Sequence, residues 1–251
     1  MKNNKKTLGI IGIGQFSEFF IPYLKPFFQD IYITSKTDKN AVAKKLSVKN
    51  STLKEVCEQD IIMLSMPISQ ISQVLDSIKK NTHEDQIIID ICSVKIFPIK
   101  EMKKKLPKDV QILGTHPLFG PQSGKDGIKG LEIVLCPARI KDEDFKKIET
   151  VFKKMGLKIT ETTPQKHDEI MAYTQALTHF FSRAAAKTIP FEDFKFTTPS
   201  AKRLRNIINE VKDDSKELFM DMQTLNPYAE KTRKKFLTEL NKINDELWKK
   251  K

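Results

Sequence analysis

The sequence predicts an α/β fold, a doubly wound and mainly parallel sheet followed by a second, all-helical C-terminal domain. Short apolar runs alternate with stretches of helical periodicity up to Pro164, a pattern typical of parallel strands joined by crossover helices. Beyond Pro164 no strand candidate remains, and apolar residues recur at helical spacing. A chain of 251 residues can form two modest domains. We therefore expect a sheet domain over residues 1–163 and a helical domain over residues 164–251.

The strand candidates are short apolar runs that lack alternation, as expected for strands buried on both faces. They lie at residues 7–13, 31–34, 60–66, 86–91, 110–114, 131–136 and 157–160. Helical spacing is expected over residues 16–28, where Pro22 should interrupt the helix, and again over residues 69–80 and 142–155.

Composition argues against several classes of protein. The net charge of +12 comes almost wholly from lysine, whereas arginine is the preferred bidentate reader of phosphate, so nucleic-acid binding is not expected. No apolar run is long enough for a membrane span. The basic N-terminus is followed by an apolar stretch too short for a secretory signal. These features predict a cytoplasmic protein that associates with neither membranes nor nucleic acid.

The three cysteines, Cys57, Cys92 and Cys136, are far apart and form no C-x-x-C pair. Such spacing indicates neither a disulfide framework nor a zinc site. We expect all three to be small core residues in a reducing compartment, and we expect no metal.

A glycine turn follows the first strand candidate. Gly12 permits a tight turn, and Gly14 lets a pyrophosphate approach the backbone. Gln15 follows, and the next helix begins near Phe16, where free N–H groups and a positive dipole end favour an anion. The Rossmann fingerprint has Gly or Ala at its sixth position, where this chain has the small residue Ser17. The turn predicts a Rossmann-like dinucleotide site, with an ordinary glycine turn as the alternative.

The end of the second strand candidate bears on the choice of cofactor. NAD-binding proteins usually carry Asp or Glu there to hold the ribose 2′-OH. This chain has Ser35 and Lys36, and its first carboxylate is Asp38. A hydroxyl beside a cation suits a 2′-phosphate, so NADP is expected and NAD is the alternative. Lys36 could instead be one more surface lysine.

Two further polar residues follow strand candidates. Ser93 comes after the run at residues 86–91, and His116 comes after the run at residues 110–114. Carboxyl ends of parallel strands are where open α/β sheets bind ligands. A neutral histidine can accept a proton from an alcohol while hydride leaves the same carbon, and a nearby serine hydroxyl can support it. The alternative for His116 is a turn histidine bonded to backbone.

With these residues identified, the chain resembles the prephenate and arogenate dehydrogenases of tyrosine biosynthesis. The resemblance rests on five segments in the family's order: Gly12-Ile13-Gly14-Gln15-Phe16, Asp90-Ile91-Cys92-Ser93-Val94-Lys95, Thr115-His116-Pro117-Leu118-Phe119-Gly120-Pro121-Gln122-Ser123-Gly124-Lys125-Asp126-Gly127, Gln175-Ala176-Leu177-Thr178-His179-Phe180 and Asp214-Ser215-Lys216-Glu217-Leu218-Phe219. The histidine segment looks most like the NADP-using arogenate branch.

The resemblance implies an NAD(P)-dependent oxidative decarboxylation of prephenate or arogenate, with arogenate slightly favoured. His116 would bond the ring hydroxyl and take its proton, and Ser93 would support it. Substrate-binding residues would be Ser123, Gln175, Thr178, His179 and Asp214, of which Asp214 would attract the ammonium of arogenate. Gln175, Thr178 and His179 lie within one helical turn and can share a face.

Some features depart from the family's pattern or stay open. Ser17 replaces the third glycine, and Arg183, Arg203 and Arg205 all fall in the region from which relatives supply an arginine to the ring carboxylate. The chain ends in three lysines, so no added regulatory domain is expected. A homodimer through the helical domain is plausible.

Two other functions compete with this one. Another two-domain Rossmann NADP-dependent reductase would usually place a lysine or aspartate on the first interdomain helix, where this chain has Gln175 and His179. A non-catalytic NADP-sensing module is disfavoured because His116 and Ser93 are both present.

Overall fold

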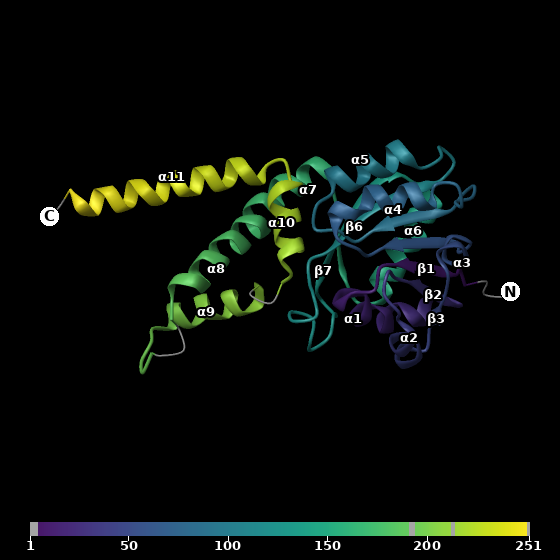
Figure 1. The fold of residues 1–251 in the computed structure, drawn as a ribbon, viewed down its shortest axis with the longest axis horizontal. Coiled ribbons are helices and arrows are strands. Elements are labelled where there is room, and N and C mark those ends of the chain that lie inside the picture. The colour runs from purple at the N-terminus through teal and green to yellow at the C-terminus, as the bar shows by residue number, and fades with distance from the viewer. Residues whose placement is uncertain (1–4, 191–193, 212–213, 250–251) are drawn as a thin grey trace. The chain divides into compact units, whose positions relative to one another are not determined.

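The computed structural model describes residues 5–190, 194–211 and 214–249 and divides into two compact units, residues 1–167 and 168–251 (Figure 1). The first unit is built on a mostly parallel sheet and the second is helical, which confirms the predicted fold class. Helix α7 (Pro164–Met171) runs across the division between the units.

The sheet has eight strands in the order β3-β2-β1-β4-β5-β6-β7-β8. All neighbouring strands are parallel except β6 and β7, which are antiparallel. The strands are β1 (Leu8–Ile11), β2 (Ile31–Thr34), β3 (Lys49–Asn50), β4 (Ile61–Leu64), β5 (Ile87–Asp90), β6 (Gln111–Pro117), β7 (Glu132–Arg139) and β8 (Lys158–Glu161).

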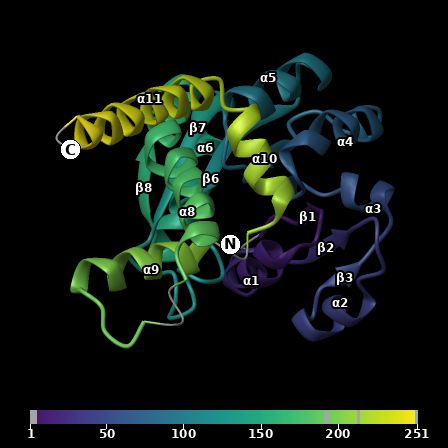
Figure 2. The same ribbon diagram turned by 60° about the vertical axis from the view of Figure 1, so that its left-hand side comes forward.

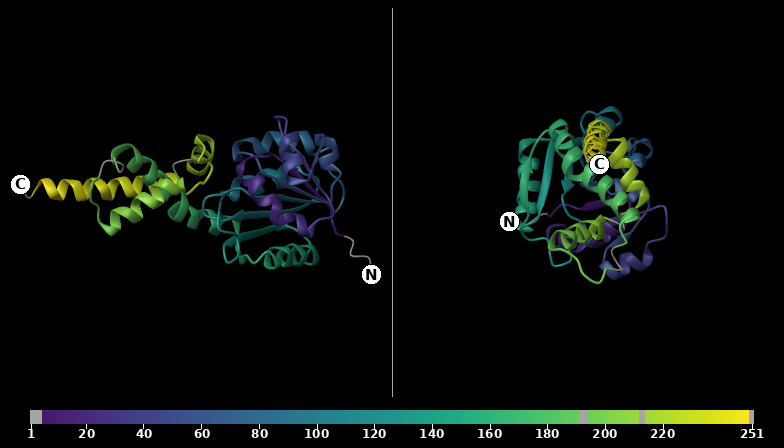
Figure 3. Two further views of the ribbon diagram at one scale, coloured as in Figure 1. Left: turned by 90° about the horizontal axis from the view of Figure 1, so that it is seen from below. Right: turned by 90° about the vertical axis from the view of Figure 1, so that its left-hand side faces the viewer.

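Helices cover both faces of this sheet, as the doubly wound pattern requires (Figure 3). Leu8 and Ile10 of β1 pack in one hydrophobic cluster with side chains of α1, α2 and α6, whereas Gly9 faces Val56 of α3 on the other side. The helices of this unit are α1 (Gln15–Leu24), α2 (Asn40–Leu46), α3 (Leu53–Cys57), α4 (Ile71–Ile78), α5 (Ile96–Lys105) and α6 (Asp142–Lys154), with 3₁₀ turns at Lys25–Phe27 and Ile68–Gln70.

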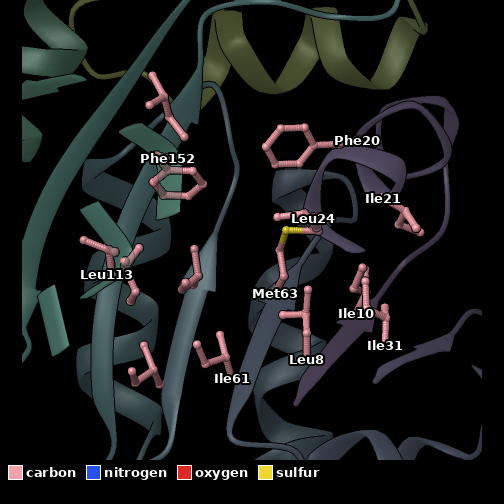
Figure 4. Packing of buried hydrophobic residues seen from close by; sticks show 14 of the residues in the cluster. Leu8, Ile10, Phe20, Ile21, Leu24, Ile31, Ile61, Met63, Leu113 and Phe152 are labelled. Atoms are coloured by element: carbon pink, nitrogen blue, oxygen red, sulfur yellow. The ribbon is translucent and has the colours of Figure 1, made fainter. Parts of the chain in front are cut away.

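The core of the sheet unit lies between the strands and helices α1 and α6. Phe20 and Leu24 from α1 and Phe152 from α6 point toward Met63 and Leu113 on the sheet (Figure 4). A cavity of about 240 Å³ with mainly apolar walls remains in this layer. All three cysteines are buried, as expected for small core residues.

The structure corrects several element predictions. Pro22 does not interrupt the first helix, because α1 continues to Leu24 and a 3₁₀ turn follows it. Helices α2, α3 and α5 and the short, exposed strand β3 were not predicted. Strand β6 does not end at Gly114 but continues to Pro117, because β7 pairs with it as far as Pro117 and Ile133.

The second unit contains helices only within its described residues (Figure 2). After α7 come a π-helical segment (Ala172–Ala176), α8 (Leu177–Thr188), α9 (Pro199–Val211), α10 (Lys216–Thr224) and α11 (Ala229–Trp248). Helix α8 packs against α9 and α11, and α10 packs against α11. None of the helices in the described ranges is long and apolar enough to cross a membrane.

Candidate active site

The carboxyl ends of four neighbouring strands line up at one edge of the sheet, where β6 continues beyond them to Pro117. The register joins Thr34 to Ile11, Ile11 to Leu64, Leu64 to Asp90 and Asp90 to Gly114. The chain crosses from one side of the sheet to the other between β1 and β4, which makes this edge the topological switch point where open α/β sheets bind ligands. The polar residues that follow these strands therefore gather at one edge.

The glycine turn has the geometry that a bound pyrophosphate needs. Gly12 has φ +93°, and a Cβ there would lie 2.3 Å from the carbonyl oxygen of Ser65, so only glycine fits. Gly14 precedes α1, and the space that its Cβ would occupy is open. The first N–H groups of the ten-residue helix α1 have no side-chain cap at Gly14 and, as at any helix N-terminus, no intrahelical partners. The turn fits a dinucleotide.

Ser17 shows how the chain dispenses with the third glycine of the fingerprint. Its side chain is fully buried, and its hydroxyl donates to the carbonyl oxygen of Gly12 at 3.0 Å. Oγ of Ser17 also lies within hydrogen-bond distance of the Ser65 hydroxyl just after β4. Helix α1 therefore packs closely on β1 and β4 with every polar atom of this side chain satisfied.

The other predicted cofactor residues flank this turn. Lys36 is exposed just beyond β2, and its Nζ donates to Oε1 of Gln70 at 3.1 Å. Ser35 is half-buried beside it, and Gln15 is exposed at the start of α1. The ring of Phe16 packs at 6.3 Å from the ring of Phe119, which links α1 to the loop after His116.

His116 lies inside strand β6, so the turn-histidine alternative is wrong. It pairs with Val134 of β7 and is only 4% exposed. Burial lowers the pKa of His116 well below its ordinary value of 6.5, and the neighbouring His167 and Lys95 lower it further. The imidazole is therefore neutral at physiological pH and can accept a hydrogen bond or a proton.

A buried ion pair holds the ends of β5 and β6 together. Lys95 and Asp90 are both fully buried and bonded to each other, and Lys95 Nζ also donates to the carbonyl oxygen of Thr115 at 2.6 Å. The Thr115 hydroxyl donates to the carbonyl oxygen of Asp90 at 2.7 Å. Burial raises the pKa of Asp90, and the Lys95 ammonium acts against that shift. These bonds fix the backbone immediately before His116.

Ser93 follows the same strand end as Asp90. It is 8% exposed, and its hydroxyl has no hydrogen-bond partner within the part of the chain that the structure describes. Oδ2 of Asp90 is likewise buried and unpartnered among those residues. Buried polar atoms are nearly always satisfied, so the Ser93 hydroxyl at this strand end is a candidate to bond a ligand. Oδ2 of Asp90 instead lies beside Gly114 and Ile99 of α5. Ser123, predicted to bind substrate, is exposed and accepts a hydrogen bond from the Gly120 amide at 3.0 Å.

The structure adds a second histidine that sequence reasoning missed. Nε2 of His167, on α7, lies 2.9 Å from Nδ1 of His116, and His167 is 2% exposed. A signal was available, because His167 is one of only four histidines and directly follows the end of the strand pattern. Asp90 and Lys95 were noticed as part of a motif but were given no role.

In the helical unit, the predicted residues His179 and Asp214 come together. Nδ1 of His179 lies 3.2 Å from Oδ2 of Asp214. The Arg183 guanidinium donates to the carbonyl oxygen of Asp214 at 2.6 Å and stacks 4.4 Å from the ring of Phe219. Burial and then Arg183 lower the pKa of His179 to about 4, while the Asp214 carboxylate favours the charged form and opposes that shift. Asp214 is thus not a merely solvated residue.

Gln175 and Thr178 are not brought into this cluster by any contact that the structure shows. Gln175 lies in the π-helical segment, so the regular helical turn expected for residues 175–179 is interrupted there. The hydroxyl of Thr178 donates to the carbonyl oxygen of Thr174 within the helix. π-helical turns are frequent at functional sites. Within the described ranges no group of three or more His, Cys, Asp or Glu residues could hold a metal ion.

Two family models match this chain, one largely within the sheet unit and one largely within the helical unit. A family model described as the nucleotide-binding domain of prephenate dehydrogenase matches residues 25–161, and one described as the dimerization domain of prephenate dehydrogenase matches residues 163–251.

Two curated relatives and one solved structure illustrate the similarity. A probable arogenate/prephenate dehydrogenase of Methanocaldococcus jannaschii is 28% identical over 98% of this chain, and the chloroplastic arogenate dehydrogenase 2 of Arabidopsis thaliana is 30% identical over 91%. The chain spans 57% and 66% of the lengths of these two proteins. A crystal structure of A. aeolicus prephenate dehydrogenase with hydroxyphenyl propionate and NAD+ superposes with a TM-score of 0.77 at 20% identity, covering 100% of this chain and 93% of that one.

Proposed function

This chain belongs to the prephenate dehydrogenase family, and on that premise we propose that it catalyses the NAD(P)-dependent oxidative decarboxylation of prephenate or arogenate. In this reaction hydride leaves the ring carbon that bears the hydroxyl, and the ring carboxylate departs as carbon dioxide. The electrons of the broken carbon–carbon bond enter the ring, which becomes aromatic. The product is a phenol, so the ring oxygen ends the reaction protonated.

The observation that carries the proposal is His116, a buried neutral imidazole at the carboxyl edge of a nucleotide-binding sheet. Positive charge develops at the hydroxyl-bearing carbon as hydride leaves, and a hydrogen-bond acceptor on that hydroxyl stabilises it. We assign this role to His116, which can take the hydroxyl proton and return it to the phenol oxygen. The unpartnered hydroxyl of Ser93 is assigned to the same ring oxygen.

The dinucleotide is assigned to the glycine turn, where Gly12, Gly14, Gln15 and Phe16 precede or begin α1. When bound, it supplies the hydride acceptor. We propose NADP rather than NAD, because Ser35 and the exposed Lys36 follow β2 where NAD-binding proteins place a carboxylate. A charge-assisted bond from Lys36 would suit a 2′-phosphate.

We assign to the helical unit the binding of those parts of the substrate that do not react. His179 and Asp214 form one cluster with Arg183, and Asp214 would favour the ammonium of arogenate over the ketone of prephenate. Gln175, Thr178 and, in the sheet unit, Ser123 remain predicted substrate contacts.

A homodimer through the helical unit completes the proposal. Four apolar side chains follow one another at helical spacing on α11 and are exposed, namely Leu237, Leu240, Ile243 and Leu247. Such a row on a 20-residue helix indicates a protein–protein contact, in keeping with the dimerization domain that matches this region.

The test is to incubate the protein with prephenate or arogenate and with NAD or NADP and to follow reduced cofactor in all four combinations. We expect arogenate with NADP to be fastest. His116→Asn should lower turnover by about 10² or more with little change in cofactor affinity, while the exposed His83→Asn serves as the matched control. Wild-type turnover in His116→Asn would contradict the assignment, and absence of reduced cofactor in every combination would contradict the proposed reaction.

A further inference from the structure

We propose that His167 is a positioning residue that fixes the tautomer of His116, so that Nε2 of His116 is the free acceptor. This inference rests on the proposed function for the role of His116. It rests on geometry for the contact itself, since Nδ1 of His116 and Nε2 of His167 are 2.9 Å apart and the rings meet at 65°. Both side chains are buried, and both residues belong to the sheet unit.

Two neutral imidazoles can share this bond in only two ways. In the first, Nδ1–H of His116 donates to the lone pair of His167 Nε2, which leaves the lone pair of His116 on its own Nε2. In the second, Nε2–H of His167 donates to Nδ1 of His116, which places the only proton of His116 on Nε2 and removes its acceptor there. Only the first arrangement leaves an acceptor for a substrate hydroxyl.

The surroundings of His116 explain why an imidazole is a suitable partner. A carboxylate bonded to Nδ1 would also fix the tautomer, but its charge would favour the imidazolium. His167 fixes the tautomer without adding negative charge. Lys95, which is paired with Asp90 behind Thr115, also disfavours the imidazolium of His116. His116 therefore stays neutral and correctly oriented before substrate binds.

The experiment compares three variants in the full chain. His167→Phe keeps a flat ring and removes the acceptor, whereas His167→Gln can still accept through its Oε1. His83→Phe, at an exposed position outside the sheet, is the matched control. We expect kcat to fall about 10- to 100-fold in His167→Phe, the scale for losing a group that orients a functional histidine, with KM little changed. His167→Gln should recover most of that loss.

A second readout does not depend on activity. ¹⁵N NMR of the histidine side chains in the cofactor-free protein reports which ring nitrogen carries the proton. We expect Nδ1–H for His116 in the wild type and in His167→Gln, and a shift toward Nε2–H in His167→Phe, with circular dichroism confirming the fold of each variant.

The two readouts separate this inference from the proposed function. If no substrate is turned over but His116 carries its proton on Nδ1, the positioning role stands and the reaction assignment fails. A wild-type His116 protonated on Nε2, or a His167→Phe variant with wild-type kcat and tautomer, would overturn the inference.

Discussion

The two units of this chain differ in how they hold their candidate functional groups. In the sheet unit, Ser93 and His116 are buried, and the adjacent backbone is fixed by the Asp90–Lys95 pair. In the helical unit, Gln175, Thr178, His179 and Asp214 are all half-buried.

The apolar surface shows the same contrast. Among the described residues the exposed large apolar side chains lie in the helical unit with the single exception of Leu118. A parallel sheet covered by helices on both faces buries its apolar residues within one chain, whereas the helices of the second unit leave apolar side chains such as Leu240 and Ile243 exposed. The sheet unit thus buries its apolar side chains within itself. The helical unit leaves apolar side chains exposed, where another molecule can cover them.

The largest effect on the contrast between the two units is expected from removing the buried ion pair, which would destabilise the sheet unit. Lys95→Met leaves the Asp90 carboxyl buried without its cation, and we expect the free energy of unfolding of the sheet unit to fall by about 3–5 kcal/mol. Urea denaturation measures the change, with Lys100→Met at an exposed position of α5 as the control. A loss no larger than that of the control would show that the pair is not what fixes the strand ends.

The cofactor assignment predicts the next largest effect. Lys36→Ala should weaken NADP about 10- to 100-fold and NAD hardly at all, because a charge-assisted bond contributes about 1.5–3 kcal/mol. Calorimetric titration of each cofactor measures this, and Lys44→Ala on α2 is the matched control. Equal weakening of both cofactors would remove the main support for NADP.

The half-buried cluster of the helical unit should give a smaller effect. Asp214→Asn preserves shape and removes charge, so the ratio of arogenate to prephenate activity should fall about tenfold for each 1.4 kcal/mol of lost ion pairing. Glu217→Gln, exposed nearby on α10, is the control. An unchanged ratio would mean that Asp214 does not select the substrate.

The pH dependence of stability tests both units together, because each unit contributes one histidine. The folded pKa of His179 is about 4, and that of His116 is also well below 6.5. Between the folded values and about 6.5 the unfolded chain binds more protons, so the free energy of unfolding falls as pH falls below 6.5, by at most about 1.4 kcal/mol per pH unit for each histidine.

Urea denaturation between pH 5 and pH 7 should show this slope. We expect it to be reduced in His179→Gln and unchanged in the exposed His83→Gln. A slope that His179→Gln leaves as steep as before would mean that the Asp214 carboxylate offsets the burial of His179.

Local pattern predicted much of the fold, and non-local contacts account for the rest. The predicted run at residues 60–66 contains β4 because a strand buried on both faces needs consecutive apolar residues. Helix α5 was missed because Pro98 and a run of lysines hide its short apolar face. The chemistry of His116 could be inferred, but its place inside β6 depends on pairing with β7.

The contact with His167 was not predictable either. The two histidines are 51 residues apart in the chain, and no periodic pattern connects them. Likewise, His179 and Asp214 were each noticed singly, and only the packing of α8 near the start of α10 joins them.

Ser17 shows which properties the sixth position of the glycine fingerprint requires of a side chain. A search that insisted on glycine or alanine at the sixth position would reject this chain, although the hydroxyl there is satisfied by Gly12 and Ser65. That position requires a small side chain with no unsatisfied polar atom. Serine meets both requirements, because its hydroxyl donates to Gly12 and can accept from Ser65. Sequence patterns that allow only fixed residue types at this position therefore miss some nucleotide-binding turns. A description based on side-chain volume and satisfied hydrogen bonds would include chains such as this one.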